Sequence, residues 1–553
     1  MDRLNVLMGG RTGDGVLEMG LLLCRLFSRL GYYVYLNNDY PSIIVGGHQF
    51  VLVRMSQKKV TAHVDQVDVV VALNQDAIDF HKDRWHAETV VLYNSGRENV
   101  SADLEKIVGI PISELLEEEK ADIKQEQMAM LGALVKTIGI PFKRLLQTWS
   151  LEEDGENKNL QNAVKKGYEA VEPMFTINKG NKSMLPVLTG SDAISLGLLE
   201  ADVEAYIAYP MTPTSPILEF MARHEKELGL HVSLPESEIA VIMQALGYAY
   251  MGVKAAVGTS GGGFSLMTES LSLAGQAELP TVIILGQRGG PGTGMPTYTA
   301  QSELSFALSA GHGEFSRLVA APGDAEEAFY WAALSVNLAW TYQIPSIILV
   351  DKTLCLNSYS FDAQLIPLIP EVKIPEWDKK GTYQRYEQTS SGVSPLAHPP
   401  LAHQAVKTNS YVHDEYGLTS EKSEHASAVV TKRFRKVKAM VDEIADYEPV
   451  KTTGEGNIVL VSWGSNKGAC LEVSDKLGLK FIQLIVMAPF PEQELKKALS
   501  GAEKVICAEM NYQGQMAMLL QQHGITVDHR IGKFDGRPFS REELENEVKK
   551  VIK

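Results

Sequence analysis

The sequence has few cysteines, and they lie far apart. Among 553 residues there are four, Cys24, Cys355, Cys470 and Cys507, and no two form a Cys-x-x-Cys pair. This spacing excludes a disulfide framework and a zinc ribbon. It also excludes an iron–sulfur cluster held by this chain alone, because such clusters need several neighbouring thiolates. We therefore expect a reduced, cytoplasmic protein whose own side chains form no metal site.

Excess positive charge and long apolar runs are also missing. Lys and Arg number 52 against 68 for Asp and Glu, which gives a formal net charge of −16. Such a charge repels nucleic acid and anionic lipid, so neither is an expected partner. The apolar runs at 329–334 and 345–350 are far too short to span a bilayer.

Three stretches of the chain alternate between apolar β-like runs and helical patterns. They span residues 1–175, 183–365 and 450–553, and this alternation is typical of α/β domains with mainly parallel sheets. Between the second and the third, residues 366–445 are rich in proline and histidine, which predicts an irregular connector. Its tyrosines, among them Tyr383 and Tyr386, favour ordered packing against a neighbour.

Three loops rich in proline, glycine or polar residues follow predicted strands of the middle stretch. The strands span 205–208, 255–258 and 281–285, and the loops span 209–215, 258–264 and 287–294. In a parallel sheet, the loops after the strand carboxyl ends lie along one edge, where ligands bind. Each loop alone is explained as well by a simple turn, but the three together predict a ligand site at this edge.

Two residues of these loops are suited to holding a carboxylate. Arg288 lies among glycines, and a guanidinium group can bind a carboxylate through two parallel hydrogen bonds. Thr212 lies between Pro210 and a second proline, so its hydroxyl is held by a stiff loop. The alternatives, a surface arginine that closes a loop and an ordinary turn hydroxyl, remain open.

Two glutamates, Glu236 and Glu238, precede a helix pattern whose apolar positions are Ile239, Ile242, Met243, Leu246 and Tyr250. Ser233 and Glu236 fit a capping box, which explains Glu236 structurally. Glu238 instead shares a face with Val241, Ile242 and Ala245, and a buried carboxyl there can serve acid–base chemistry. The alternative is an exposed glutamate that stabilises the helix dipole.

Several longer motifs carry a resemblance to a known family. The middle stretch contains Tyr209-Pro-Met-Thr-Pro, Thr259-Ser-Gly-Gly-Gly-Phe-Ser-Leu-Met and Arg288-Gly-Gly-Pro-Gly-Thr-Gly-Met-Pro-Thr. They resemble the alpha subunit of the 2-oxoacid:ferredoxin oxidoreductases. Gly9-Gly-Arg-Thr-Gly-Asp-Gly and Tyr40-Pro-Ser-Ile-Ile-Val-Gly-Gly-His resemble the gamma domain of that family, fused here at the N-terminus. Gly13-Asp-Gly15, which taken alone suggests a thiamine diphosphate magnesium motif, is thereby assigned to the gamma domain.

The resemblance implies a fold and a reaction. The fold is α/β, with three successive domains whose middle member binds the pyrimidine part of thiamine diphosphate. The implied reaction is the coenzyme A-dependent oxidative decarboxylation of a 2-oxoacid to acyl-CoA and carbon dioxide, with ferredoxin as electron acceptor. A separate beta subunit is implied to hold the pyrophosphate, its Mg²⁺ and a [4Fe-4S] cluster, so we expect a hetero-oligomer.

Roles for single residues also follow from the resemblance. Glu238 matches the glutamate that hydrogen-bonds the aminopyrimidine ring and activates the cofactor. Thr212 and Arg288 match residues that bind the 2-oxoacid, with Arg288 at its carboxylate. Further residues are expected to face the cofactor: Pro210, Thr259 and Ser260.

The sequence departs from the family pattern in two places and leaves two other functions open. Gly262 stands where the family often has proline, and Gly292 where it often has serine; loop shape beside Arg288 is expected to select the acyl tail. The preferred 2-oxoacid therefore stays open among 2-oxoglutarate, pyruvate and branched-chain acids. The open alternatives are another thiamine diphosphate enzyme that works without ferredoxin and a non-catalytic α/β module.

Overall fold

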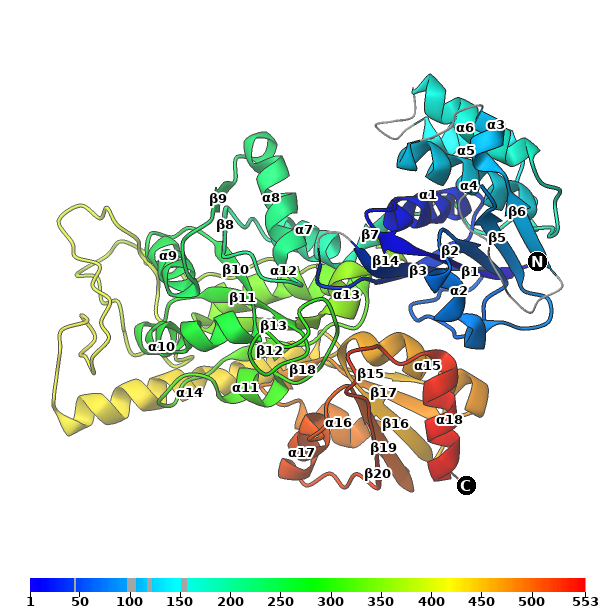
Figure 1. The fold of residues 1–553 in the computed structure, drawn as a ribbon. Coiled ribbons are helices and arrows are strands. Elements are labelled where there is room, and N and C mark those ends of the chain that lie inside the picture. Colours follow the sequence, from blue (N-terminus) through cyan, green and yellow to red (C-terminus); the bar gives the residue numbers. More distant parts are fainter. Residues whose placement is uncertain (44–45, 97–105, 117–121, 151–156, 553) are drawn as a thin grey trace. The chain divides into compact units, whose positions relative to one another are not determined.

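The computed structural model describes residues 1–43, 46–96, 106–116, 122–150 and 157–552, and the chain forms two compact units (Figure 1). The first unit comprises Met1–Thr189, Leu356–Asp362 and Phe539–Asn546. The second comprises Gly190–Cys355, Ala363–Pro538 and Glu547–Lys553. Within the described ranges, no helix combines the length and the apolar character needed to cross a bilayer.

One sheet forms the centre of the first unit. Its strands, in spatial order, are β6 (Ile107–Ile110), β5 (Val90–Asn94), β4 (Val69–Ala72), β1 (Arg3–Thr12), β3 (Gly46–Ser56), β2 (Tyr33–Asp39), β14 (Ser358–Ser360) and β7 (Val187–Thr189). The strands from β6 to β1 pair in parallel, whereas those from β1 to β7 pair antiparallel. The sheet is therefore mixed, and only half of it follows the parallel pattern that the sequence predicts.

Helices cover this sheet, and apolar side chains of α1 and α4 form much of its core. The helices of the first unit are α1 (Val16–Arg29), α2 (Asp76–Asp79), α3 (Ile112–Leu116), α4 (Ile123–Thr137), α5 (Phe142–Trp149) and α6 (Lys158–Glu169), with a short 3-10 helix at Lys82–Arg84. Gly15, in the left-handed conformation with φ 65°, begins α1. Part of the motif that starts at Tyr40, residues 44–45, lies outside the described residues.

Two strands of this sheet come from the stretch predicted to form the middle domain. β7 and β14 come from the two ends of that stretch of the chain, at residues 187–189 and 358–360. In the sheet, β14 pairs with β2. Asn357 fixes the arrangement, because its side chain donates to Asn37 Oδ1 at 3.1 Å and accepts from the Asn38 backbone at 3.0 Å. Asn37 and Asn38 thus take part in pairing within the sheet.

The second unit contains two further sheets. The strands of the larger, in spatial order, are β18 (Val486–Ala488), β12 (Leu318–Ala320), β13 (Pro345–Asp351), β11 (Thr281–Gln287), β10 (Ala255–Ser260), β8 (Ala205–Ala208) and β9 (His231–Ser233). Those of the smaller are β15 (Val450–Thr453), β17 (Lys480–Leu484), β16 (Ile458–Ser462), β19 (Lys504–Glu509) and β20 (His529–Gly532). All pairs are parallel except β12 with β18 and β15 with β17. The α/β fold class with mainly parallel sheets is confirmed.

The two sheets of the second unit share a continuous apolar core. Every residue of β11 and β13 is buried, as expected for parallel strands covered on both faces. Two consecutive strands belong to different sheets: β17 lies in the smaller sheet, while β18 joins the larger one next to β12. One core cluster accordingly contains Ile283 of the larger sheet and Leu484 of the smaller.

Helices pack against both of these sheets. Those of the second unit are α7 (Gly190–Glu200), α8 (Ser215–Leu228), α9 (Glu238–Tyr250), α10 (Gly261–Ala277), α11 (Leu304–Ser309), α12 (Ala325–Tyr342), α13 (Lys352–Leu356), α14 (Ser423–Ala445), α15 (Lys467–Leu477), α16 (Glu492–Ala498) and α17 (Gln515–Gln522). The last helix, α18 (Arg541–Ile552), begins in the first unit, where Ser540 Oγ donates to Asp65 at 2.6 Å.

The connector is ordered, and it ends in a long helix that its composition did not predict. Residues 366–422 contain no regular helix or strand, but Tyr383 and Tyr386 are buried at 3% and 1% exposure. The 23-residue helix α14 occupies the rest of the predicted irregular segment (Figure 1). Its apolar positions are few, and its buried residues include Lys432 and Lys436, so a hydrophobic pattern could not reveal it.

Candidate active site

Three of the predicted strands bring their carboxyl ends to one sheet edge. β8, β10 and β11 are neighbours and run parallel, so the residues that follow them lie side by side. The segment predicted as a loop at 258–264 is not one. β10 continues through Ser260, and α10 begins at once with Gly261. The glycines there form the first turn of a helix.

Glu238 is buried beside this junction. It is the first residue of α9, and its side chain is 5% exposed. Ser237, not Ser233, caps the helix by accepting from the Ala240 backbone, so the predicted capping box is wrong. Ser233 belongs to β9 instead. The burial of Glu238 among Val241, Ile242 and Ala245 agrees with the predicted helix face.

Glu238 and Thr259 meet around Gly263. A Cβ atom at position 263 would lie 2.3 Å from Glu238 Oε1 and 2.2 Å from Thr259 Oγ1. Only glycine, which has no Cβ atom, fits at position 263. Ser260 is fully buried, and its hydroxyl has no hydrogen-bond partner among the described residues. The polar atoms of these side chains therefore surround the first turn of α10.

Arg288 and Thr212 are also brought together. Arg288 Nη1 donates to the Thr212 backbone carbonyl at 3.1 Å. Burial lowers the pKa of Arg288, and the nearby carboxylate of Glu303 opposes that shift. The contact requires the loop after β8 to lie close to β11, where a Cβ atom at Gly286 would come within 2.8 Å of Pro213. Pro210, which was predicted to face the cofactor, is exposed.

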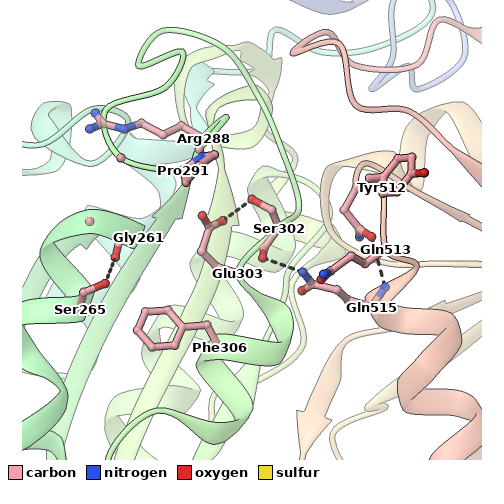
Figure 2. A pocket seen from close by; sticks show the side chains of 14 residues that line it. Gly261, Ser265, Arg288, Pro291, Ser302, Glu303, Phe306, Tyr512, Gln513 and Gln515 are labelled. Atoms are coloured by element: carbon pink, nitrogen blue, oxygen red, sulfur yellow. Dashed lines mark hydrogen bonds between the residues drawn. The ribbon is translucent and has the colours of Figure 1, made fainter.

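A cavity of about 520 Å³ opens at this edge (Figure 2). Arg288, Glu303 and the start of α10 line it from one side, and the segment after β19 lines it from the other. The lining residues are Gly261, Gly262, Ser265, Arg288, Gly290, Pro291, Gly292, Ser302, Glu303, Phe306, Asn511, Tyr512, Gln513 and Gln515. Among these lining residues, Arg288 is the one that the sequence predicted for the site. Glu238 and Thr259 lie next to Gly263, which does not line the cavity.

The contribution of residues 511–515 was not predicted. Their position after the carboxyl end of β19 is the same signal that identified the other loops, but the smaller sheet was not expected to contribute to the site. Gln515 joins the two sides: its side chain donates to Ser302 O at 2.8 Å and accepts from the Ser305 backbone at 3.0 Å. Asn511 donates to Gln301 O at 3.0 Å, a second hydrogen bond that joins the segment after β19 to the segment after β11.

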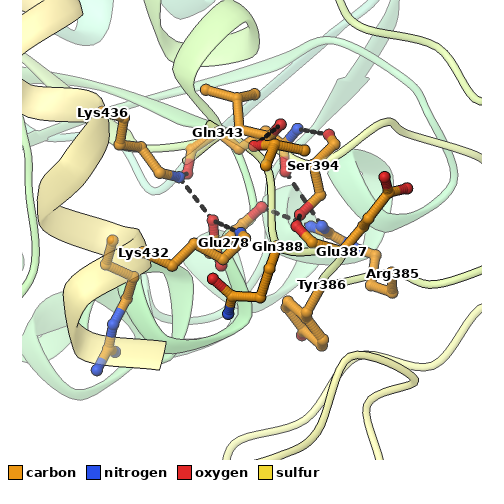
Figure 3. A network of polar contacts seen from close by, with 12 residues as sticks. Glu278, Gln343, Arg385, Tyr386, Glu387, Gln388, Ser394, Lys432 and Lys436 are labelled. Atoms are coloured by element: carbon orange, nitrogen blue, oxygen red, sulfur yellow. Dashed lines mark hydrogen bonds and ion pairs between the residues drawn. The ribbon is translucent and has the colours of Figure 1, made fainter. Parts of the chain in front are cut away.

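A buried ion cluster fixes the far end of α10 (Figure 3). Glu278, which ends the helix in the left-handed conformation, accepts from Lys432 Nζ at 2.7 and 2.9 Å and from Lys436 Nζ at 2.6 Å. Arg385 donates to the Glu278 carbonyl at 2.7 Å. Although burial alone raises the pKa of Glu278, the ammonium groups of Lys436 and Lys432 hold it well below its ordinary value. The connector and α14 thereby hold α10 in place.

Comparison with known proteins agrees with this geometry. Residues 196–433 match the family described as pyruvate flavodoxin/ferredoxin oxidoreductase, thiamine diphosphate-binding, and residues 5–172 match the pyruvate ferredoxin/flavodoxin oxidoreductase family. The 2-oxoacid:ferredoxin oxidoreductase subunit alpha of Saccharolobus solfataricus is 31% identical over 100% of this chain and 98% of its own length. This chain belongs to the 2-oxoacid:ferredoxin oxidoreductase alpha subunits.

Other relatives of this alpha subunit agree in fold and reaction class. The 2-oxoglutarate synthase subunit KorA of Methanocaldococcus jannaschii is 30% identical and covers 65% of the chain and 98% of its own length. A solved 2-oxoglutarate:ferredoxin oxidoreductase of Magnetococcus marinus, with 2-oxoglutarate, coenzyme A and succinyl-CoA bound, superimposes over 100% of both chains with a TM-score of 0.91 at 27% identity. The predicted family, fold class and oxidoreductase function are therefore confirmed, and the preferred 2-oxoacid is not assigned.

Proposed function

We propose that this alpha subunit supplies the substrate-binding and pyrimidine-facing half of a thiamine diphosphate site. One observation carries the proposal: the side chains of Glu238, Thr259 and Arg288 lie at a single sheet edge, beside a cavity. Arg288 would bind the carboxylate of the 2-oxoacid, together with the loop of Thr212. Glu238 would hydrogen-bond the aminopyrimidine ring of the cofactor.

The residues around Gly263 fit a cofactor of this kind. Gly262 has no atom within 3.9 Å of a Cβ position, so a planar ring can approach the start of α10 closely. The Ser260 hydroxyl, which has no hydrogen-bond partner within the part of the chain that the structure describes, supplies a polar atom that a ligand can satisfy. When bound, thiamine diphosphate supplies the carbanion chemistry for decarboxylation. Glu238 would hold and move a proton at the ring, and Arg288 would orient a carboxylate that leaves as carbon dioxide.

We further propose that a beta subunit completes the site with the pyrophosphate, its Mg²⁺ and a [4Fe-4S] cluster. The four cysteines of this chain support this division, because each thiol is buried and they lie on four separate elements, α1, α13, α15 and β19. Thiols that form no disulfide also support a location in the reducing cytoplasm. The net charge of −16 repels an acidic ferredoxin, which favours an electron exit on the beta subunit.

An exposed apolar surface on α9 and α10 supports a partner subunit near the site. Ile239 and Met243, one turn apart on α9, are 53% and 46% exposed, and Leu266 on α10 is 50% exposed. Large exposed side chains of this kind are typical of protein interfaces. Coenzyme A, which is bound in the Magnetococcus marinus relative, is the proposed acyl acceptor here.

The proposal is tested with the subunit co-produced with its partner. We expect reduction of a viologen dye that depends on a 2-oxoacid, coenzyme A and thiamine diphosphate. Arg288→Ala should raise KM by roughly 10- to 100-fold, since a hydrogen bond to a charged group contributes about 1.5–3 kcal/mol. Arg288→Lys should recover part of that loss, and Arg223→Ala, at an exposed position on α8, serves as the control. An unchanged KM in Arg288→Ala would contradict carboxylate binding by this residue.

A further inference from the structure

The cavity beside Arg288 contains one carboxyl group, that of Glu303, to which the proposed function gives no role. We propose that Glu303 is a positioning residue whose proton controls how firmly Arg288 holds the carboxylate of a 2-oxoacid. This inference rests on the proposed function, because it takes Arg288 to be the substrate anchor. It assigns a regulatory property to the same pocket.

The geometry places the Glu303 carboxyl inside the substrate cavity. Figure 2 shows it pointing toward the loop that carries Arg288 and Pro291. Its Oε1 lies 2.8 Å from the position that a Cβ atom on Gly261 would occupy, so it rests directly against the first residue of α10. Ser302 Oγ donates to Oε2 at 3.2 Å. The Glu303 backbone donates to Gln287 Oε1 at 3.1 Å, which ties the residue to the end of β11.

The structural duties of this side chain are small. Glu303 precedes the short helix α11, but its carboxyl makes no capping hydrogen bond there. The hydrogen bond from Ser302 is one that a glutamine oxygen can also accept. Replacement of the carboxyl by an amide should therefore leave the local fold in place while removing the charge.

Few charged groups share the cavity with Glu303. Among its described lining residues, the charged or titratable ones besides Glu303 are Arg288 and Tyr512, while residues 511, 513 and 515 are amides. Burial raises the pKa of Glu303 to about 7, with smaller opposing contributions from the Ser302 hydroxyl and the Arg288 charge. The group thus exchanges its proton near neutral pH.

The two charge states give the pocket different affinities for an anion. Ionised Glu303 attracts the Arg288 guanidinium and repels an incoming carboxylate. Protonated Glu303 leaves the positive charge of Arg288 available to the substrate. Binding of the 2-oxoacid therefore favours uptake of one proton from solvent, and the affinity should fall as pH rises through the pKa of Glu303.

The experiment measures KM for pyruvate and for 2-oxoglutarate between about pH 6 and pH 9 in the co-produced complex. In the unaltered complex, KM should rise by up to about tenfold for each pH unit above the pKa of Glu303. The rise should be steeper for the dianion 2-oxoglutarate, because ionised Glu303 repels two charges. In Glu303→Gln, KM should stay low and change by less than about twofold over the same range, with kcat near that of the unaltered complex at the acidic end.

Two further variants separate the charge effect from a structural one. Glu303→Asp should keep the pH dependence, because it keeps a titratable carboxyl. Glu269→Gln, at an exposed position on α10, should behave like the unaltered complex. An active complex whose Glu303→Gln variant keeps the same KM–pH profile would overturn the role of Glu303 alone. A complex with no 2-oxoacid-dependent dye reduction would overturn the proposed function, and this inference with it.

Discussion

At the scale of single residues, Glu238 is the side chain to which we assign proton transfer. A first-turn glutamate is ordinarily exposed, yet here α9 turns this side chain into the protein, where it meets Thr259 across a glycine. In the assembled complex, Glu238→Gln should lower kcat by about 10²-fold or more, because a positioned acid–base group contributes on that order. KM should change little, since substrate binding is assigned to Arg288.

Glu236→Gln is the matched control for this variant. Glu236 lies two residues earlier and is exposed, so its replacement should leave kcat and KM unchanged. Dye reduction under saturating thiamine diphosphate measures both variants. Near-normal turnover of Glu238→Gln would rule out the proton-transfer role.

At the scale of elements, the first turn of α10 offers a test with two adjacent glycines. A Cβ atom on Gly263 would lie 2.3 Å from Glu238 Oε1, whereas one on Gly262 would lie 3.9 Å from its nearest neighbour, Met211. Gly263→Ala should therefore displace Glu238 and reduce kcat strongly. Gly262→Ala should leave Glu238 in place, so it should lower kcat much less than Gly263→Ala does, and it should stabilise the helix by about 0.5–1 kcal/mol.

Comparable losses of activity in the two alanine variants would show that α10 tolerates no side chain at either position. Melting temperatures measured beside kcat distinguish this outcome from the expected one. The comparison also bears on sequence reasoning: both glycines belong to one motif, and only the packing of α9 against α10 distinguishes their roles.

The far end of α10 depends on the charge of Glu278. Glu278→Gln would leave the buried ammonium groups of Lys432 and Lys436 without their counter-ion, at a cost of about 3–5 kcal/mol. Lys438→Met removes the exposed pair with Asp442 on the same helix, and should cost less than about 1 kcal/mol. The midpoint of urea-induced unfolding measures both; equal shifts would contradict the stabilising role of the cluster.

The Glu278 cluster also predicts a pH dependence of stability. Because the folded-state pKa of Glu278 is lowered, its stabilisation is fully present above the unfolded pKa of a glutamate, about 4.3. It is lost as pH falls through the lower, folded-state value. Unfolding midpoints taken on acidification should therefore fall more steeply for the unaltered protein than for Glu278→Gln.

At the scale of the whole molecule, the proposed site shared by the alpha and beta subunits requires an interface between them. Ile239 and Met243 lie on one exposed face of α9, close in sequence to Glu238. Ile239→Glu with Met243→Glu should weaken assembly with the beta subunit and leave the melting temperature of the isolated alpha subunit unchanged. Size-exclusion chromatography of the co-produced chains measures assembly.

Leu368→Glu is the control, because this side chain is 92% exposed on the connector and distant in sequence from the α9 surface. It should assemble normally. Full assembly of the Ile239→Glu, Met243→Glu variant would remove this face from the proposed interface.

The sequence by itself determined the α/β class and three neighbouring strands of the larger sheet in the second unit, and it identified Arg288 as a candidate for binding a carboxylate. These features depend on local signals: β8 is observed at the predicted residues, and β10 and β11 begin at the predicted residues. Buried parallel strands are continuous apolar runs, and the residues after them must lie at one edge. Family motifs added a predicted role for Glu238, whose burial the helix pattern had left open.

Only the tertiary structure decided which distant segments meet. β14 and β7 join the first sheet, β18 joins the second, and residues 511–515 complete the cavity beside Arg288. Strand pairing and side-chain packing act between segments whose order in the chain carries no signal of contact. The same reason applies to Glu303. Its residue type was visible in the sequence, but its place in the cavity depends on how the segment that follows β11 packs against the first turn of α10.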